Sequence, residues 1–376
     1  MPQEPILSIS GPLMEAQLLE TLVLNIINHQ SLIATKAWQI TNAADGRAVM
    51  EFGARRAQGP DAATYGARAA IIGGCSSTSN VLAAKLFHVP AVGTMAHAWI
   101  ESFPDELTAF RAWAKIYPDT AALLVDTYDV VNSGVPNAIK VFKELRAAGH
   151  EPVGIRIDSG DITQLAKKAR KMLDDAGFPN AKITASNALD AHIVKALLED
   201  GAPLDNFGIG ERLITSSSSP VLSGVYKMSE LENNGKWEPK IKISNSREKI
   251  TLPGNKQVYR LYKKDEPNKA FADVIALNDE QIGDTISAVN ADVYATCDKV
   301  ELKDFVAKPL LSEILTPDHE KDIETDTFAI QKFAHQKVAE LPTATKRLVN
   351  PDRYPVFLTK NLADLQQKLI SEYRNI

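Results

Sequence analysis

The sequence has few cysteines, no excess of positive charge and no long apolar run. Its 376 residues include two cysteines, Cys75 and Cys297. Two thiols exclude a disulfide framework and a four-cysteine zinc site. A low cysteine content is typical of proteins in reducing compartments, and we therefore expect a cytoplasmic protein. The formal net charge of −5 disfavours nucleic acid as a partner, because proteins that bind it neutralise phosphates with a basic surface.

The missing apolar runs exclude other classes of protein. No stretch approaches the roughly 20 apolar residues that a membrane-spanning helix needs, so we expect no membrane partner. Met1–Pro5 shows no basic region followed by an apolar one, which argues against a signal peptide. The chain is also longer than the roughly 250–300 residues at which single hydrophobic cores usually stop growing. Two domains, or one large barrel with additions, are therefore expected.

Strand-like and helix-like segments alternate between about residues 46 and 212. Short apolar runs, typical of buried strands, lie at Ala48–Phe52, Ala91–Val92, Ala122–Val125, Val153–Ile157, Lys182–Ala185 and Phe207–Ile209. Amphipathic stretches between them predict helices at Asn137–Ala148, Ile162–Ala176 and Leu189–Asp200. Gly149 and Gly177 follow the first two helices, where a left-handed cap is expected. The pattern predicts parallel strands covered by helices, an α/β fold.

The flanking segments follow different patterns. Leu13–Ile27 is apolar nearly all round, which predicts a buried helix. After Val221, alternating segments predict antiparallel strands with one wet face, at Lys240–Ser244 and Gln257–Tyr262, with turns at Asn233–Gly235 and Pro253–Asn255. The last sixty or so residues are charged and resemble an appendage, with helices expected at Thr327–Ala339 and Leu362–Tyr373.

Polar residues follow five successive strands at the point where each strand ends. These segments are Gly93–His97, Asp126–Asp129, Asp158–Asp161, Ser186–Asn187 and Gly208–Arg212. The carboxyl ends of parallel strands meet at one edge of the sheet, where α/β enzymes have their active sites. A turn explains one such cluster, but turns alone do not explain five in register. The sequence therefore predicts an enzyme.

Charged residues at this edge suggest an anionic substrate. Arg156 lies on an otherwise apolar strand and needs an anionic partner, for which a carboxylate or phosphate fits best. Asp158 could hold Mg²⁺ against a polyphosphate, whereas we interpret Asp129 as a loop acid. Asp161 either joins the magnesium site or caps the next helix. Gly208 and Gly210 would let backbone N–H groups approach an anion, although this motif alone is weak evidence.

One of the seven histidines differs from the rest. His97 lies just past a strand end, where Asp126 could bind one imidazole nitrogen and leave the other as a nucleophile or base. We interpret the other six as structural. Phe52 either stacks on a planar ligand or packs internally, and four further aromatic residues are interpreted as packing: Trp99, Phe103, Trp113 and Tyr117.

Five motifs together resemble the nicotinate phosphoribosyltransferase family: Glu51–Asp61, Gly93–Trp99, Gly154–Asp161, Phe207–Thr215 and Pro220–Lys227. The resemblance runs with great specificity from Glu4 to about Lys227 and more loosely beyond. It implies a type II phosphoribosyltransferase, usually a homodimer, with an irregular α/β barrel at 46–212. A second, sandwich-like domain would comprise 1–45 and 213–312, with a C-terminal appendage at 313–376.

The resemblance also implies a reaction and roles for the matching residues. Nicotinate and phosphoribosyl pyrophosphate would give nicotinate mononucleotide and pyrophosphate, coupled to ATP hydrolysis. His97 matches the histidine that ATP phosphorylates, and Asp126 matches its orienting acid. Phe52 matches the aromatic residue that stacks on the pyridine ring. Thr94 and Arg156 match residues near the nicotinate carboxylate.

The remaining matches concern phosphoribosyl pyrophosphate and the choice of acceptor. Arg55 matches a residue at this substrate, and Asp158 matches a catalytic acid near the ribose. Residues at the 5′-phosphate are matched by Ser186, Asn187, Gly208, Gly210 and Thr215. The protein alone would hold no metal, and Mg²⁺ would enter mainly with the pyrophosphate, near Asp158 and Asp161. Ser79 stands where nicotinamide-using relatives have aspartate, and a serine suits nicotinate because it adds no negative charge.

Two departures from the family pattern leave alternatives open. The chain begins inside the pattern, without an N-terminal portion whose tyrosine packs near nicotinate across the dimer. Ala98 and Glu211 also replace residues that are common in relatives. A fragment or partner subunit that only binds ligand is therefore one alternative, and another pyridine such as nicotinamide as acceptor is a second. Without the resemblance to this family, the residues alone would predict a barrel enzyme that acts on sugar phosphates.

Overall fold

The computed structural model describes residues 1, 3–246, 249–292 and 299–374, and it contains two compact units. The half-barrel unit comprises residues 26–223 and 324–335, and the mixed-sheet unit comprises residues 1–25, 224–323 and 336–376. Cys75 is buried with a free thiol, and Cys297 lies outside the described residues. Among the helices that the structure describes, none is long and apolar enough to cross a membrane.

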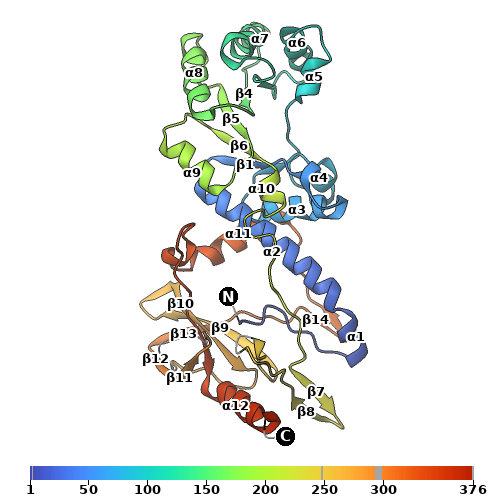
Figure 1. Cartoon of the computed structure of the whole chain (residues 1–376), viewed down its shortest axis with the longest axis vertical. Coiled ribbons are helices and arrows are strands. Elements are labelled where there is room, and N and C mark those ends of the chain that lie inside the picture. Colours follow the sequence, from blue (N-terminus) through green and yellow to red (C-terminus); the bar gives the residue numbers. More distant parts are fainter. Residues whose placement is uncertain (2, 247–248, 293–298, 375–376) are drawn as a thin grey trace. The chain divides into compact units, whose positions relative to one another are not determined.

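The half-barrel unit contains a sheet of six parallel strands in the order β2-β1-β6-β5-β4-β3 (Figure 1). The strands are β1 (Ala48–Glu51), β2 (Ser77–Thr78), β3 (Ala122–Leu124), β4 (Gly154–Ile157), β5 (Lys182–Asn187) and β6 (Asn206–Ile209). Among the described residues, the predicted run Ala91–Val92 makes a single bridge, from Ala91 to Thr78 at the β2 edge. At the other edge, the Leu124 N–H donates to Met95 Sδ at 3.3 Å. The predicted α/β fold is confirmed, with the parallel strands forming a half-barrel.

Helices connect these strands and cover the sheet. They are α3 (Pro60–Ile72), α4 (Val81–Phe87), α5 (His97–Glu101), α6 (Glu106–Ile116), α7 (Val135–Ala147), α8 (Ile162–Asp175), α9 (Ala191–Glu199) and α10 (Glu211–Ile214). The amphipathic pattern of α8 buries Ala166, Ala169 and Leu173, as its spacing predicts. Gly149 and Gly177 have φ values of 89° and 84°, which confirms the predicted left-handed caps.

One glycine in this sheet leaves no room for a side chain. Gly154, the first residue of β4, has a φ of 155°, and a Cβ there would lie 2.1 Å from the Lys182 carbonyl oxygen. We expect Gly154→Ala to lower the free energy of unfolding by about 2–3 kcal/mol, because it adds backbone strain and overpacking. Urea denaturation measures the loss. Gly149→Ala is the matched control, since its Cβ would meet nothing within 4 Å, and an equal loss there would contradict the steric argument.

The mixed-sheet unit contains a second six-stranded sheet, in the order β12-β11-β16-β10-β9-β13. Its strands are β9 (Lys256–Lys263), β10 (Glu266–Leu277), β11 (Thr285–Asn290), β12 (Lys299–Lys303), β13 (Phe305–Pro309) and β16 (Val356–Thr359). The predicted strand at Gln257–Tyr262 lies within β9 and is confirmed. Residues packed at its core include Leu261, Val274 and Phe305. The described part of the unit also contains two small hairpins: β7 (Glu230–Asn233) with β8 (Lys236–Pro239), and β14 (Leu315–Thr316) with β15 (His319–Glu320).

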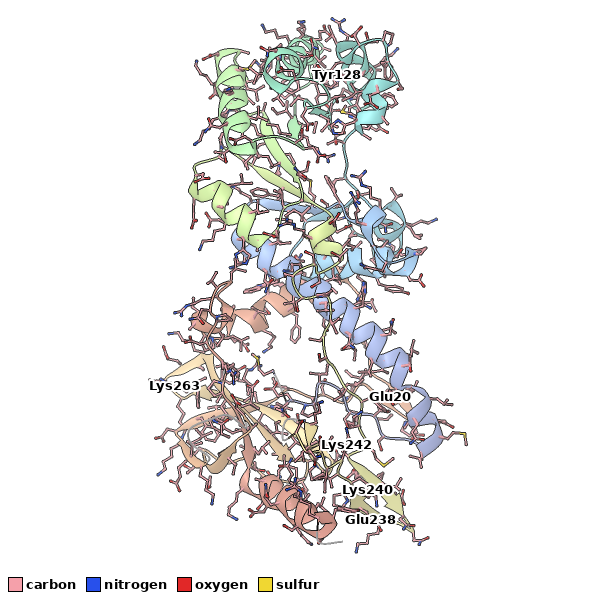
Figure 2. The ribbon with its side chains drawn as sticks, in the orientation of Figure 1. Glu20, Tyr128, Glu238, Lys240, Lys242 and Lys263 are labelled. Carbon is pink, nitrogen blue, oxygen red and sulfur yellow. The ribbon has the colours of Figure 1, made fainter. Side chains whose placement is uncertain are left out.

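The predicted strand at Lys240–Ser244 is wrong. β8 ends at Pro239, and Lys240 and Lys242 lie on irregular chain after it (Figure 2). Their N–H groups donate to the Ser229 carbonyl and the Thr251 hydroxyl, both at 2.8 Å, rather than to a neighbouring strand. Alternation of polar and apolar residues cannot reveal whether a partner strand is present.

The C-terminal residues provide an interior strand as well as helices. The helix α11 (Thr327–Ala339) has the predicted bounds, and α12 (Lys360–Arg374) contains the predicted helix at Leu362–Tyr373. Before α12, β16 pairs in parallel with β10 and antiparallel with β11. Residues 356–359 are thus built into the sheet, although residues 313–376 were expected to form an appendage. A four-residue run buried on both faces has no alternation that would reveal it.

The prediction of a buried helix at Leu13–Ile27 is also wrong. The segment forms α1 (Leu13–Leu18) and the start of α2 (Glu20–Ala43). Met14, Leu18 and Leu22 are 75%, 76% and 58% exposed. An apolar helix is buried only where other elements enclose it, and the described part of the chain does not enclose this one.

Candidate active site

Arg156 on β4 joins three polar residues from separate segments. Its Nε donates to Ser186 Oγ at 2.7 Å, and its two terminal nitrogens donate to Thr94 Oγ1 at 2.9 Å and Asp158 Oδ1 at 2.8 Å. The guanidinium carbon also lies 5.5 Å from the centre of the Phe52 ring. The structure therefore brings together five predicted site residues at the carboxyl ends of β1, β4 and β5 and in the segment after Ala91.

Asp158 is held as a carboxylate. Burial by itself would raise its pKa, but hydrogen bonds from Ser186 and Arg156 and the charge of Arg156 outweigh burial and hold the pKa below its usual value. Its Oδ1 accepts from both of these residues. Its Oδ2 lies 3.7 Å from His97 Nε2. One carboxylate oxygen is thus fixed by the protein, and the other faces the histidine.

His97 begins α5 and lies between two acids and a threonine. Its side chain is 41% exposed, and Nε2 lies 3.9 Å from Asp126 Oδ1. The ring and Asp126 are therefore brought together, but not within hydrogen-bond distance. Nδ1 lies 3.1 Å from Thr127 Oγ1, a contact that sequence reasoning missed. The only signal for Thr127 was its position directly after Asp126 at a strand end.

Asp126 is almost completely enclosed. Its side chain is 1% exposed, and Oδ2 accepts from the Asp158 N–H at 3.1 Å and Ser159 Oγ at 2.5 Å. Its Oδ1, on the side of His97, is buried without a hydrogen-bond partner among the described residues. A buried carboxylate oxygen of this kind favours a donor or cation beside it, which a protonated imidazole or a ligand would supply.

Phe52 packs against the two predicted glycines. A Cβ on Gly208 would lie 2.5 Å from the Phe52 ring, and one on Gly210 would lie 3.0 Å from the Phe52 carbonyl oxygen. The Phe52 N–H donates to the Ile209 carbonyl at 2.8 Å. Close packing against Phe52 therefore explains why these positions need glycine, and their binding of phosphate stays a prediction.

The other predicted residues have local contacts. Asn187 ends β5 with a φ of 120°, and its Oδ1 accepts from the Ala188 N–H. Thr215 donates to the Glu211 carbonyl at 2.7 Å. Ser79 is exposed, and its N–H donates to the Glu51 carbonyl at 2.9 Å. Arg55 is exposed on the short 3-10 helix Ala54–Arg56. No hydrogen bond among the described residues links these four side chains to Arg156.

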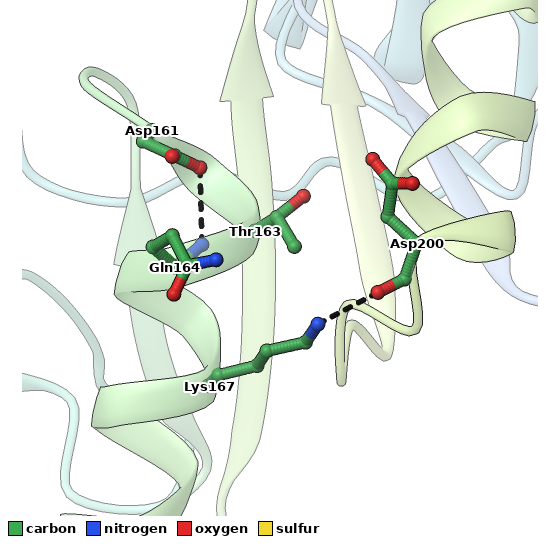
Figure 3. Close-up of a pocket in the computed structure, with 5 residues that line it drawn as sticks. All are labelled: Asp161, Thr163, Gln164, Lys167 and Asp200. Carbon is green, nitrogen blue, oxygen red and sulfur yellow. Dashed lines mark hydrogen bonds between the residues drawn. The ribbon is translucent and has the colours of Figure 1, made fainter.

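Two acids cap the segments that follow them, as one interpretation of Asp161 expected, whereas Asp129 was interpreted only as a loop acid. Asp129 accepts from the N–H groups of Val131 and Asn132, and Asp161 accepts from the Gln164 N–H at 3.0 Å. Asp161 also lines a pocket between α8 and the end of α9, where Lys167 donates to the Asp200 carbonyl (Figure 3). The side chains of Asp161 and Lys167 thus bond to nearby backbone.

The four aromatic residues interpreted as packing form a chain of ring contacts. Trp99 lies 4.9 Å from Phe103 and 5.6 Å from Trp113, and Trp113 lies 4.7 Å from Tyr117. The packing interpretation is confirmed. Within the described ranges, no three His, Cys, Asp or Glu residues are grouped closely enough to hold a metal ion.

Comparisons with known proteins match nearly the whole chain. Residues 47–272 match the nicotinate phosphoribosyltransferase (NAPRTase) family, and residues 255–366 match the nicotinate phosphoribosyltransferase C-terminal domain. The chain is 43% identical to nicotinate phosphoribosyltransferase of Bacillus subtilis, covering 99% of this chain and 75% of the relative. It is 34% identical to the Dictyostelium discoideum enzyme of the same name, covering 98% and 71%. The crystal structure of human nicotinic acid phosphoribosyltransferase superposes with a TM-score of 0.83 at 28% identity, covering 96% of this chain and 78% of that chain.

Proposed function

Because the chain belongs to the nicotinate phosphoribosyltransferase family, we propose that it joins nicotinate to phosphoribosyl pyrophosphate at the Arg156 cluster and couples this step to ATP hydrolysis. The observation that carries the proposal is the guanidinium of Arg156, which bonds to Thr94, Asp158 and Ser186 beside the Phe52 ring. A cation, hydroxyl groups and an aromatic face are what an anionic pyridine requires.

Nicotinate binds between these groups. Its carboxylate takes hydrogen bonds from Arg156 and Thr94, and Phe52 stacks on the ring. Ser79 adds no negative charge that would repel the carboxylate, which favours nicotinate over nicotinamide. The pyridine nitrogen then attacks the anomeric carbon of phosphoribosyl pyrophosphate, and the bond from that carbon to pyrophosphate breaks. Nicotinate mononucleotide and pyrophosphate are the products.

The phosphoribosyl substrate occupies the strand ends beside this pocket. Asp158 lies near the ribose, where its ionised carboxylate supports the positive charge that develops at the anomeric carbon. Arg55 binds the substrate, and its 5′-phosphate lies near Ser186, Asn187, Gly208, Gly210 and Thr215. The Oδ2 of Asp158, on the side of His97, fits a hard cation, whereas Asp161 is engaged as a cap. Mg²⁺ entering with the pyrophosphate would neutralise the departing charge.

His97 is the proposed site of ATP coupling. A ring nitrogen takes the γ-phosphate of ATP and ADP leaves, and water later hydrolyses the phosphohistidine to phosphate. Its exposed ring and its place beside two carboxylates, with Thr127 at the other nitrogen, support this role. ATP hydrolysis is then coupled to nucleotide synthesis because the protein alternates between a phosphorylated and a free state.

We also propose that the chain forms a homodimer in the cytoplasm. Light scattering on the purified chain tests the dimer.

Labelling with γ-³²P-ATP and Mg²⁺ tests the phosphohistidine. We expect acid-labile label on the wild-type chain and none on His97→Ala, because the acceptor nitrogen is removed. His150→Ala is the matched control, since His150 also contacts a carboxylate, Asp119 at 2.7 Å, and it should keep the label.

Turnover of nicotinate is measured on the same preparations. Equal label on His97→Ala and wild type would contradict the role of His97. Binding of phosphoribosyl pyrophosphate by a folded wild-type chain, without turnover, would favour the alternative of a chain that only binds ligand. Faster use of nicotinamide than of nicotinate would contradict the assignment of the acceptor.

A further inference from the structure

Glu51 is a buried carboxylate at the carboxyl end of β1. Its side chain is completely buried, which raises the pKa of its carboxyl, while hydrogen bonds from Thr78 and Gly53 oppose the rise. Both partners are neutral groups. A buried acid stabilised only by neutral donors is costly for the fold, so its position requires an explanation.

The carboxylate connects two separate segments of the chain. Its Oε1 accepts from the Gly53 N–H, and its Oε2 accepts from Thr78 Oγ1 at 2.6 Å. Thr78 Oγ1 itself accepts from the Asn80 N–H at 2.9 Å, so its single proton is directed at Glu51. The Glu51 carbonyl also accepts from the Ser79 N–H at 2.9 Å. Glu51 is therefore an acceptor at all three oxygens.

Each connected segment carries one residue of the nicotinate pocket. Phe52 directly precedes Gly53, and Ser79 directly follows Thr78. Gly53 leaves little freedom in this turn, because a Cβ there would lie 2.5 Å from Ile214 Cβ and 2.9 Å from Glu51 Oε1. The backbone that carries Phe52 is thus held between Glu51 and Ile214.

We propose that Glu51 is a positioning residue that fixes Phe52 relative to Ser79 and thereby sets the affinity for nicotinate. The inference rests on the proposed function. Most proposed contacts of phosphoribosyl pyrophosphate lie at the ends of β4, β5 and β6, and of the residues proposed to bind it Arg55 alone lies just after Gly53. Loss of Glu51 should therefore weaken the binding of nicotinate much more than the binding of phosphoribosyl pyrophosphate.

Glu51→Gln tests the inference. The amide keeps one acceptor for Gly53 but turns its NH₂ toward Thr78, whose hydroxyl proton then loses its acceptor. We expect KM for nicotinate, and its Kd by calorimetry, to rise about tenfold. KM for phosphoribosyl pyrophosphate and kcat should stay within about twofold. Thr78→Val should act in the same direction, and Thr78→Ser, which keeps the hydroxyl, should restore the wild-type KM.

Glu106→Gln is the matched control. Glu106 lies in the same unit, is 3% exposed, and accepts from Ser133 at 2.7 Å and Asn137 at 3.0 Å. None of these residues lies in the proposed pocket, so this variant should lose stability and keep its KM for nicotinate.

Three results would overturn the inference. One is a folded Glu51→Gln or Thr78→Val chain with an unchanged KM for nicotinate. Another is an equal rise of both KM values, and the third is the same rise in Glu106→Gln. Thr78→Val serves as the test if Glu51→Gln does not fold. A wild-type chain that turns over no nicotinate would overturn the proposed function and this inference together, whereas an active wild type isolates the inference.

Discussion

Replacing Arg156 with methionine is expected to lower kcat/KM for nicotinate by about 10²–10³-fold. The change removes the cation that binds the substrate carboxylate and leaves the half-buried Asp158 without its ion pair. Truncating one partner of a buried, hydrogen-bonded charge pair costs about 2–5 kcal/mol, a range that includes the roughly 3–4 kcal/mol of this loss. Steady-state kinetics with nicotinate as the varied substrate measures the effect.

The pH dependence of the same variant gives a second measurement. The charge and hydrogen bond of Arg156 help to hold the pKa of Asp158 below its usual value, so the wild type keeps this carboxylate ionised to low pH. Without Arg156 the pKa rises, and the acid limb of the kcat/KM profile should move to higher pH. An acid limb at an unchanged pH would show that Asp158 does not govern it.

Arg170→Met is the control for the loss of an arginine. Arg170 lies on α8 of the same unit and bonds to Asp174 and to the carbonyls of Phe178 and Ala181. The Arg170→Met substitution should lower the free energy of unfolding without changing kcat/KM for nicotinate in the folded enzyme. Arg156→Lys keeps the charge but not the three-way hydrogen bonding, so we expect it to remain well below wild type. Wild-type kinetics in Arg156→Met would remove the main support for the proposed site.

Asp273→Asn is expected to lower the free energy of unfolding of the mixed-sheet unit by about 3–5 kcal/mol. Asp273 is completely buried and binds Arg260 through two hydrogen bonds of 3.0 and 2.8 Å. Tyr354 also donates to it at 3.1 Å. Removing the acid leaves a buried guanidinium without its ion-pair partner, which is strongly destabilising. Urea denaturation gives the size of the loss, and hydrogen exchange of β9 and β10 locates it.

An exposed ion pair on the same unit provides the contrast. Lys264 and Asp284 lie 2.7 Å apart at the surface, so Asp284→Asn should leave the unfolding transition unchanged. Replacing both Arg260 and Asp273 with apolar residues should recover much of the stability, because no buried charge then remains unpaired. Equal losses in Asp273→Asn and Asp284→Asn would contradict the role assigned to burial.

The sequence by itself determined the α/β class and most of the residues that meet at the site. Arg156, Asp158 and Ser186 could be grouped because they lie near the carboxyl ends of neighbouring parallel strands, and these ends share one edge of the sheet. Local rules also held where they depend only on nearby residues. Asp161 caps its helix, and Gly149 takes the left-handed conformation that its cap requires.

Only the tertiary structure decided which groups touch. It placed Thr127 rather than Asp126 within hydrogen-bond distance of His97, packed Phe52 against Gly208, and buried Glu51 between two segments. It also set β16 inside a sheet and left Met14 and Leu18 exposed on an apolar helix. The physical reason is the same in each case. Periodicity along the chain reports which faces are apolar, whereas the partner of a face or a side chain comes from residues far away in sequence.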